Sequence, residues 1–180
     1  MDIPIRFKIY LFWKNLFSKK EDSPHIKITK EGRGVRSVLF FLPEKKEDAK
    51  VINYFVKVES PLSDYEIGLI CSDKSKSFYP HVENVSLFTY NDNDLNYFNT
   101  IKSVSLLNEI KIKNYDAIVD LNTSFCAASS MLFFDLDAPL KIGFDSLINR
   151  KIYTITLEQT ENAFLESYFS KILSLLGVKF

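Results

Sequence analysis

The sequence predicts an α/β fold in which helices cover both faces of a doubly wound, mostly parallel sheet of about six strands. Two observations carry this prediction. Short, almost continuously apolar segments alternate with longer segments whose apolar residues recur at helical spacing. Strands that are apolar throughout are typical of parallel sheets buried on both faces. The chain of 180 residues suits one domain.

The predicted elements follow one another along the chain. Asparagine and aspartate residues suit the start of the second domain helix, and Gly177 lies where a glycine commonly ends the last one. The candidate strands are residues 37–42, 66–72, 85–90, 116–121, 140–144 and 151–157. The candidate helices are residues 46–62, 93–114, 124–136 and 161–176.

An amphipathic helix is expected ahead of this domain, within residues 1–20. Ile9, Trp13 and Leu16 share one face, and residues 3–20 contain five basic residues but no acidic one. Such a helix suits an anionic membrane surface, but the same pattern would suit docking on the domain or on a partner protein. The candidate docking residues are Arg6, Lys8, Trp13, Lys14, Phe17, Lys19 and Lys20. Residues 21–35 are predicted to be a linker, and residues 36–180 the single domain.

Composition excludes several function classes. Basic and acidic residues balance at 23 each, which argues against a general nucleic-acid binder. Cys71 and Cys126 do not form a disulfide framework, and no signal peptide is visible, so a cytoplasmic protein is expected. No apolar run approaches the ~20 residues of a membrane-spanning helix.

Ligands of such sheets bind outside the carboxyl ends of the strands. The first of these turns, residues 43–48, holds five charged residues and no glycine. A carboxylate there could be a general base, or could simply favour the start of a helix electrostatically. No phosphate-binding glycine motif is present, and neither His25 nor His81 has the neighbours of a zinc site. We therefore expect no metal and no cofactor.

Two further candidates have a structural explanation. Asp135 and Asp137 form an acidic D-x-D pair of the kind that some glycosyltransferases use for a metal, but three-residue motifs recur by chance and this one ends a helix. Cys126 falls within an apolar segment, where packing is expected rather than a nucleophilic role.

Residues 114–144 carry a distinctive order of short motifs. Tyr115-Asp116 precedes a strand that ends in Asp120-Leu121, a helix rich in alanine and serine follows, and the next strand ends in Gly143-Phe144. In this order they resemble the N-terminal domain of the heptosyltransferases of glycosyltransferase family 9, which build the inner core of lipopolysaccharide. Weaker similarities extend to residues 64–67, 79–82 and 161–178.

The resemblance implies a Rossmann-like domain that faces the acceptor sugar, with Asp48 in register with the family's catalytic base. It also implies an acceptor-site loop at Asn122, Thr123 and Ser124. Glu44 and Glu47 stand where the family has glycines, so two carboxylates would repel a phosphorylated acceptor. Residue 180 falls where the donor-binding domain of the family would begin, so that domain is expected to be absent.

The sequence therefore favours a divergent, non-catalytic relative that acts as a binding or assembly module. It is expected to be peripheral, at the inner face of the cytoplasmic membrane, where it contacts the membrane surface or a membrane protein complex. Two alternatives stay open. One is the acceptor-binding half of a split glycosyltransferase, with Asp48 as base and a separate polypeptide as donor domain. The other is a small accessory subunit of a membrane protein complex.

Overall fold

A six-stranded parallel sheet forms the centre of the computed structural model, which describes residues 4–17, 34–55, 65–79, 85–159 and 164–177. The strands are β1 (Ser37–Phe41), β2 (Glu66–Ser72), β3 (Ser86–Tyr90), β4 (Ala117–Asp120), β5 (Leu140–Phe144) and β6 (Ile155–Leu157). Their order is β3-β2-β1-β4-β5-β6, and all five pairings are parallel. This order confirms the predicted doubly wound α/β fold and puts the topological switch between β1 and β4.

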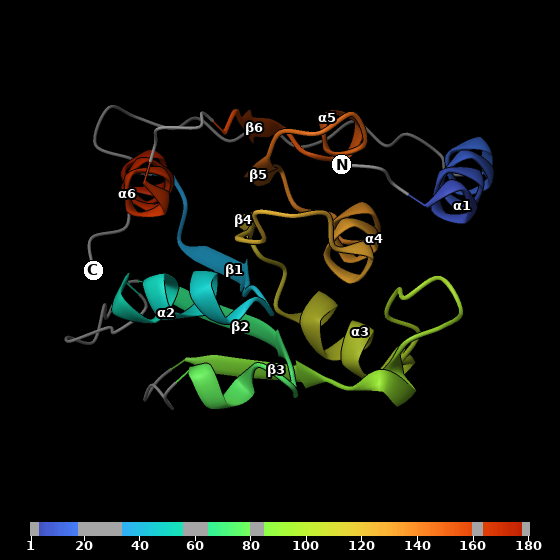
Figure 1. Cartoon of the computed structure of the whole chain (residues 1–180), viewed down its shortest axis with the longest axis horizontal. Helices are drawn as coiled ribbons and strands as arrows, with labels where there is room; N and C mark the ends of the chain where they lie inside the picture. The colour runs from blue at the N-terminus through green and yellow to red at the C-terminus, as the bar shows by residue number, and fades with distance from the viewer. Residues whose placement is uncertain (1–3, 18–33, 56–64, 80–84, 160–163, 178–180) are drawn as a thin grey trace.

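Helices cover both faces of the sheet (Figure 1). One face carries α2 (Lys46–Phe55) and α6 (Leu165–Leu176), whose buried residues include Ile52 and Phe169. The other face carries α3 (Val104–Ile112), α4 (Ala127–Asp135) and the short α5 (Asn149–Ile152), with Ile110 and Phe133 in the core. Two 3₁₀ turns, η1 (Lys76–Phe78) and η2 (Asp92–Asp94), follow β2 and β3. Gly177 ends α6 with a left-handed φ of 70°, as predicted.

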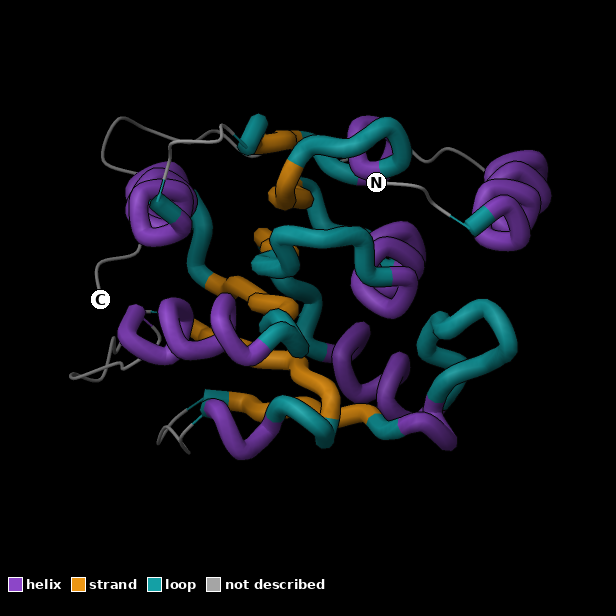
Figure 2. The backbone as a smooth tube through the Cα atoms, in the orientation of Figure 1, coloured by secondary structure: helices purple, strands orange, loops and turns teal. Residues whose placement is uncertain are grey.

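The helix predicted over residues 93–114 is wrong in its first half. Only Val104–Ile112 is helical, and a loop closed by a bridge between Leu95 and Ile101 comes before it. The Asn96 side-chain oxygen accepts the N–H groups of Phe98, at 2.9 Å, and Thr100, at 3.2 Å. Asparagine side chains that bond to nearby backbone in this way compete with helix formation. The result is the teal loop of Figure 2, which lies beside α3.

The sixth predicted strand is also shorter than expected, because residues 151 and 152 belong to α5. The predicted linker lies mostly outside the described residues, although its last residue, Val35, is buried in the core. No described helix is long and apolar enough to span a membrane.

The N-terminal helix α1 (Ile5–Phe17) forms as predicted and packs on the domain beyond α4 (Figure 1). Phe7 and Leu11 are buried at 1% and 9% exposure against Met131 and Ile148. The face predicted to be apolar points the other way. Ile9 and Trp13 of that face are 54% and 57% exposed, and the neighbouring Phe12 and Ile5 are 65% and 76% exposed. The side chain of Leu16 lies outside the described residues. The helix is therefore apolar on two sides, one buried and one in contact with solvent.

Candidate functional site

A cleft of about 600 Å³ lies at the carboxyl edge of the sheet. Its walls come from the start of α2, the turn after β2, the loops after β3 and β4, and the N-terminal helix α1. The loops after β1 and β4 meet here because these strands are neighbours at the switch point, which is where open α/β sheets bind ligands.

The predicted site residues meet in this cleft. Asp48, Asn122 and Ser124 line it, and Thr123 donates its hydroxyl hydrogen to Asp48 Oδ2 at 2.5 Å. Asp48 lies in the first turn of α2 and is only 8% exposed. Its hydrogen bond with Thr123 joins the loop after β4 to the helix that follows β1.

The glycine-free turn after β1 is fixed by two tyrosines, one directly after η1 and one at the end of β3. Tyr79 donates its hydroxyl to the carbonyl oxygen of Pro43 at 2.7 Å, and Tyr90 donates to Glu44 Oε1 at 2.9 Å. Burial raises the pKa of both phenols far above its ordinary value, so both stay protonated and act as donors. The side chains of this turn and the two tyrosines bonded to it thus occupy the position where a glycine-rich turn would expose its backbone N–H groups.

The buried carboxylate of Asp120, at the end of β4, is hydrogen-bonded to a residue that lines the cleft. Asp120, 3% exposed, accepts hydrogen bonds from the backbone of Asn122 at 3.0 Å and from its side-chain amide at 2.7 Å. Its other oxygen accepts the hydroxyls of Ser129 and Tyr153, each at 2.6 Å. Burial raises the pKa of Asp120, although these four hydrogen bonds act against the rise.

This network was not predicted from the sequence. Tyr153 lies 33 residues from Asp120, so their contact depends on the fold. The available signal was a single aspartate at the end of an otherwise apolar strand. Such a residue, if buried, needs several donors. The network orients Asn122 and thereby shapes one wall of the cleft.

Cys126 lines the cleft at the residue before α4. Burial, together with the nearby Asp120, raises the pKa of its thiol to about 12. Only a thiolate is a good nucleophile, so the structure agrees with a packing role for this cysteine.

The candidate docking residues are divided among different surroundings. The Arg6 guanidinium lies 5.1 Å from the ring centre of Tyr97 and borders the cleft, whereas Lys8 and Trp13 are exposed. The side chains of Lys14 and Phe17, and the whole of Lys19 and Lys20, lie outside the described part of the chain. The structure therefore does not test a docking role for these four residues.

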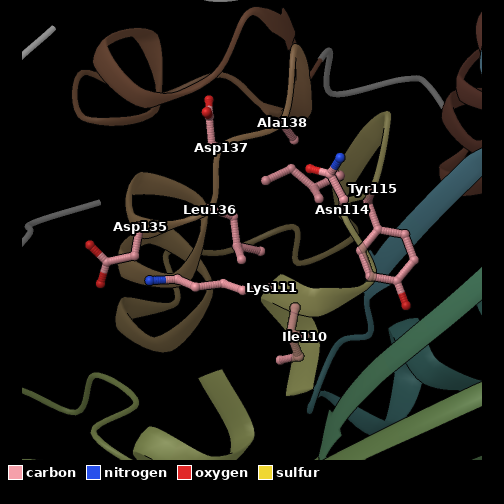
Figure 3. Close-up of a pocket in the computed structure, with 9 residues that line it drawn as sticks. Ile110, Lys111, Asn114, Tyr115, Asp135, Leu136, Asp137 and Ala138 are labelled. Atoms are coloured by element: carbon pink, nitrogen blue, oxygen red, sulfur yellow. The ribbon is translucent and has the colours of Figure 1, made fainter. Parts of the chain in front are cut away.

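A second, smaller pocket of about 270 Å³ lies at the opposite edge, beside the amino end of β4 (Figure 3). Asp135 and Asp137 both border it, but their carboxylates point in different directions. Among the described residues, no group of three or more histidines, cysteines or carboxylates could hold a metal ion. Within these residues, the D-x-D pair therefore belongs to no such group.

Comparison with known proteins gives one finding on the fold. No protein-family model matches the sequence, and no curated protein matches it significantly. Among solved structures, the chain is similar to the glycosyl transferase family 9 protein from Veillonella parvula DSM 2008, with a TM-score of 0.55 and 18% identity. The match covers 81% of this chain and 42% of that one. The chain therefore has a Rossmann-like α/β fold like that found in a glycosyltransferase family 9 protein.

Proposed function

We propose that this chain is a divergent relative of the glycosyltransferase family 9 acceptor-side domain that binds a ligand without transferring sugar. In this proposal it works as a binding and assembly module at the cytoplasmic surface of a membrane. The observation that carries the proposal is that two carboxylates after β1, those of Glu44 and Asp48, already accept hydrogen bonds from side chains of the protein.

A general base must receive a proton from the substrate hydroxyl that it activates. Asp48 Oδ2 already accepts the Thr123 hydroxyl at 2.5 Å, in a charge-assisted bond of the strong class, so a substrate hydroxyl would have to use the other carboxylate oxygen or displace Thr123. Glu44 is held by Tyr90 at the position where a phosphorylated acceptor would need a donor. These contacts favour a cleft that binds a ligand without taking a proton from it.

A transfer assay tests the catalytic half of this proposal. The purified chain is incubated with radiolabelled nucleotide-sugars and lipopolysaccharide-core acceptors, and we expect no labelled product. Product that disappears in Asp48→Asn and persists in the exposed control Glu47→Gln would overturn the non-catalytic role.

The membrane half of the proposal is supported by the outward face of α1. This face is apolar and exposed at Ile9 and Phe12, and basic residues at positions 6 and 8 flank it on either side. Helices of this kind lie in the interface of anionic bilayers, with their cations near the headgroups.

Vesicle flotation tests that half. We expect the chain to float with vesicles that contain phosphatidylglycerol, with a blue shift in the emission of Trp13, the only tryptophan. The double substitution Ile9→Glu with Phe12→Glu should abolish both signals. Phe164→Glu, which changes an even more exposed apolar residue outside α1, should not. Failure of the unaltered chain to float, with co-purification of an integral membrane protein, would favour the accessory-subunit alternative.

The split glycosyltransferase remains a second candidate because Asp48, Asn122 and Ser124 do line one cleft at the switch point. In that case a separate donor-binding polypeptide would restore transfer. Asp48→Asn would then lower the activity of the reconstituted pair by roughly 10²–10⁴-fold, the usual contribution of a general base.

A further inference from the structure

We infer that α1 forms a wall of the ligand cleft, and that the cleft it completes binds an uncharged, hydroxyl-rich ligand, such as an unphosphorylated monosaccharide or disaccharide. This inference rests on the binding role proposed above and specifies the ligand class and the part of the site that α1 supplies. Three kinds of observation support it: ring contacts, charge balance and size.

The ring contacts show that α1 positions two aromatic residues of the cleft. Tyr10 stacks on Phe98 with ring centres 4.8 Å apart and an angle of 16° between the planes. Phe7 meets Phe125 edge to face at 4.9 Å. Phe98 and Phe125 come from different loops, after β3 and β4, and both line the cleft together with Phe7. Without α1, these two rings would lose the surfaces that hold them.

Arg6 adds a polar group to the same wall. Its guanidinium carbon lies 5.1 Å from the ring centre of Tyr97, a cation–π contact that leaves the N–H groups free to donate hydrogen bonds elsewhere. Arg6 lines the cleft, so these donors are available to hydroxyl oxygens of a ligand. The N-terminal helix thus supplies both apolar and hydrogen-bonding contact.

The charges of the cleft wall cancel. Among its described residues three side chains are basic and three are acidic, namely Arg6, Lys45, Lys74, Glu44, Asp48 and Asp92. Lys74 and Asp92 also neutralise each other directly, with Nζ and Oδ1 2.6 Å apart. A wall without net charge gives no net electrostatic attraction to a phosphate or sugar acid, and its carboxylates would have to lose water beside such an anion.

The remaining wall suits hydroxyl groups and the apolar faces of a sugar ring. Asn99, Asn122 and Ser124 offer neutral donors and acceptors, while Phe98 and Phe125 offer flat apolar surface. A volume of about 600 Å³ is within the usual range of small-ligand sites. This combination favours a neutral carbohydrate over a nucleotide or a sugar phosphate.

Saturation-transfer NMR on the full chain, without lipid, tests this inference. The probes are methyl α-mannoside, methyl α-glucoside, N-acetylglucosamine and maltose, with mannose 6-phosphate and glucuronic acid as anionic counterparts. We expect at least one uncharged probe to bind, and its anionic counterparts to bind at least about tenfold more weakly, a difference of about one logarithmic unit in Kd.

Variants of α1 test the wall itself. Tyr10→Ala and Arg6→Gln should each weaken binding of the uncharged probe by about fivefold or more, since each removes a hot-spot type of contact. Tyr10→Phe keeps the stacked ring and should recover most of the binding that Tyr10→Ala loses. Lys151→Gln removes a positive charge from an exposed position on α5 and serves as the matched charge control. Circular dichroism confirms that each variant is folded.

Three outcomes would overturn the inference. These are preference for the anionic probes, absence of binding to every probe, and unchanged binding by both Tyr10→Ala and Arg6→Gln. Flotation separates this result from the proposed function. A chain that floats but binds no sugar loses the inference and keeps the membrane role, whereas a chain that binds sugar through α1 but does not float keeps the inference alone.

Discussion

Two tyrosines pack against the same face of the sheet, each over a glycine of a strand, but they differ at the hydroxyl. Tyr153 lies over Gly143 of β5 and donates its hydroxyl to the buried Asp120 at 2.6 Å. Tyr115 lies over Gly68 of β2, and its buried hydroxyl has no hydrogen-bond partner in the described part of the chain. A Cβ added at either glycine would collide with the tyrosine above it.

The difference shows that the tyrosine rings at the two edges of the sheet are held in place in different ways. At the carboxyl edge, beside the cleft, the ring of Tyr153 is positioned by packing and by a hydrogen bond to a carboxylate that also orients Asn122. At the amino edge, Tyr115 is positioned by packing alone. The two regions should therefore respond differently to the same substitutions.

Gly143→Ala should have the largest effect. The added methyl group meets the ring of Tyr153, which cannot move away without breaking its bond to Asp120. We expect the free energy of unfolding to fall by about 3 kcal/mol, at the upper end for overpacked cores, as measured by urea denaturation. Gly68→Ala should cost less, because Tyr115 has no such bond to break. Equal losses at the two glycines would contradict the comparison.

Tyr153→Phe should come next. It leaves one oxygen of the buried Asp120 short of a donor, which costs about 1–3 kcal/mol of unfolding free energy. Two-dimensional NMR should also show shifts at Asn122, because the network that orients it has changed. A variant as stable as the original chain would show that the hydrogen bond contributes little.

Asp120→Asn should change the pH dependence of stability. Burial raises the pKa of Asp120, so the unfolded chain releases this proton at a lower pH than the folded chain does. The free energy of unfolding should therefore fall as the pH rises from about 4 to the raised folded value, by at most about 1.4 kcal/mol per pH unit. Urea denaturation across that range should show this slope in the original chain and not in the variant.

A control for this slope is Asp145→Asn. Its hydrogen bonds with Arg150 lower the pKa of Asp145, so that group acts in the opposite sense. Loss of the same slope in both variants would mean that Asp120 is not its source.

Tyr115→Phe should have the smallest effect, a change close to zero or a slight gain. It removes a buried hydroxyl that has no partner among the described residues, and such a group gives up its hydrogen bonds to water without replacing them. Thermal denaturation beside Tyr153→Phe provides the direct contrast. A loss as large as that of Tyr153→Phe would indicate an ordered water or another partner at this hydroxyl.

Much of the fold could be predicted because the strands are apolar on both faces and the helices keep regular spacing. The bounds predicted for β2 and β5 match the structure. The meeting of Asp48 with Asn122 and Ser124 also follows from topology alone, since carboxyl ends of neighbouring strands share an edge.

The rest depended on tertiary contacts that a one-dimensional pattern does not contain. The loop at Asn96 was mistaken for helix because apolar spacing outweighed asparagine hydrogen bonding. On α1, the sequence indicates an apolar face at Ile9 and Trp13, and the structure leaves that face exposed while Phe7 and Leu11 pack on the domain. Which of two apolar faces is buried depends on the surface that receives the helix.

The hydrogen bond between Thr123 and Asp48 joins residues that are 75 positions apart in the chain. The cleft is therefore a product of long-range pairing between β1 and β4, which are separated in the chain by β2, β3 and their connections. No short fragment of the chain can present it. A ligand of the cleft binds only the assembled domain, so it should raise the melting temperature in proportion to the logarithm of its concentration. This dependence allows candidate ligands to be ranked by thermal shift without knowledge of any reaction.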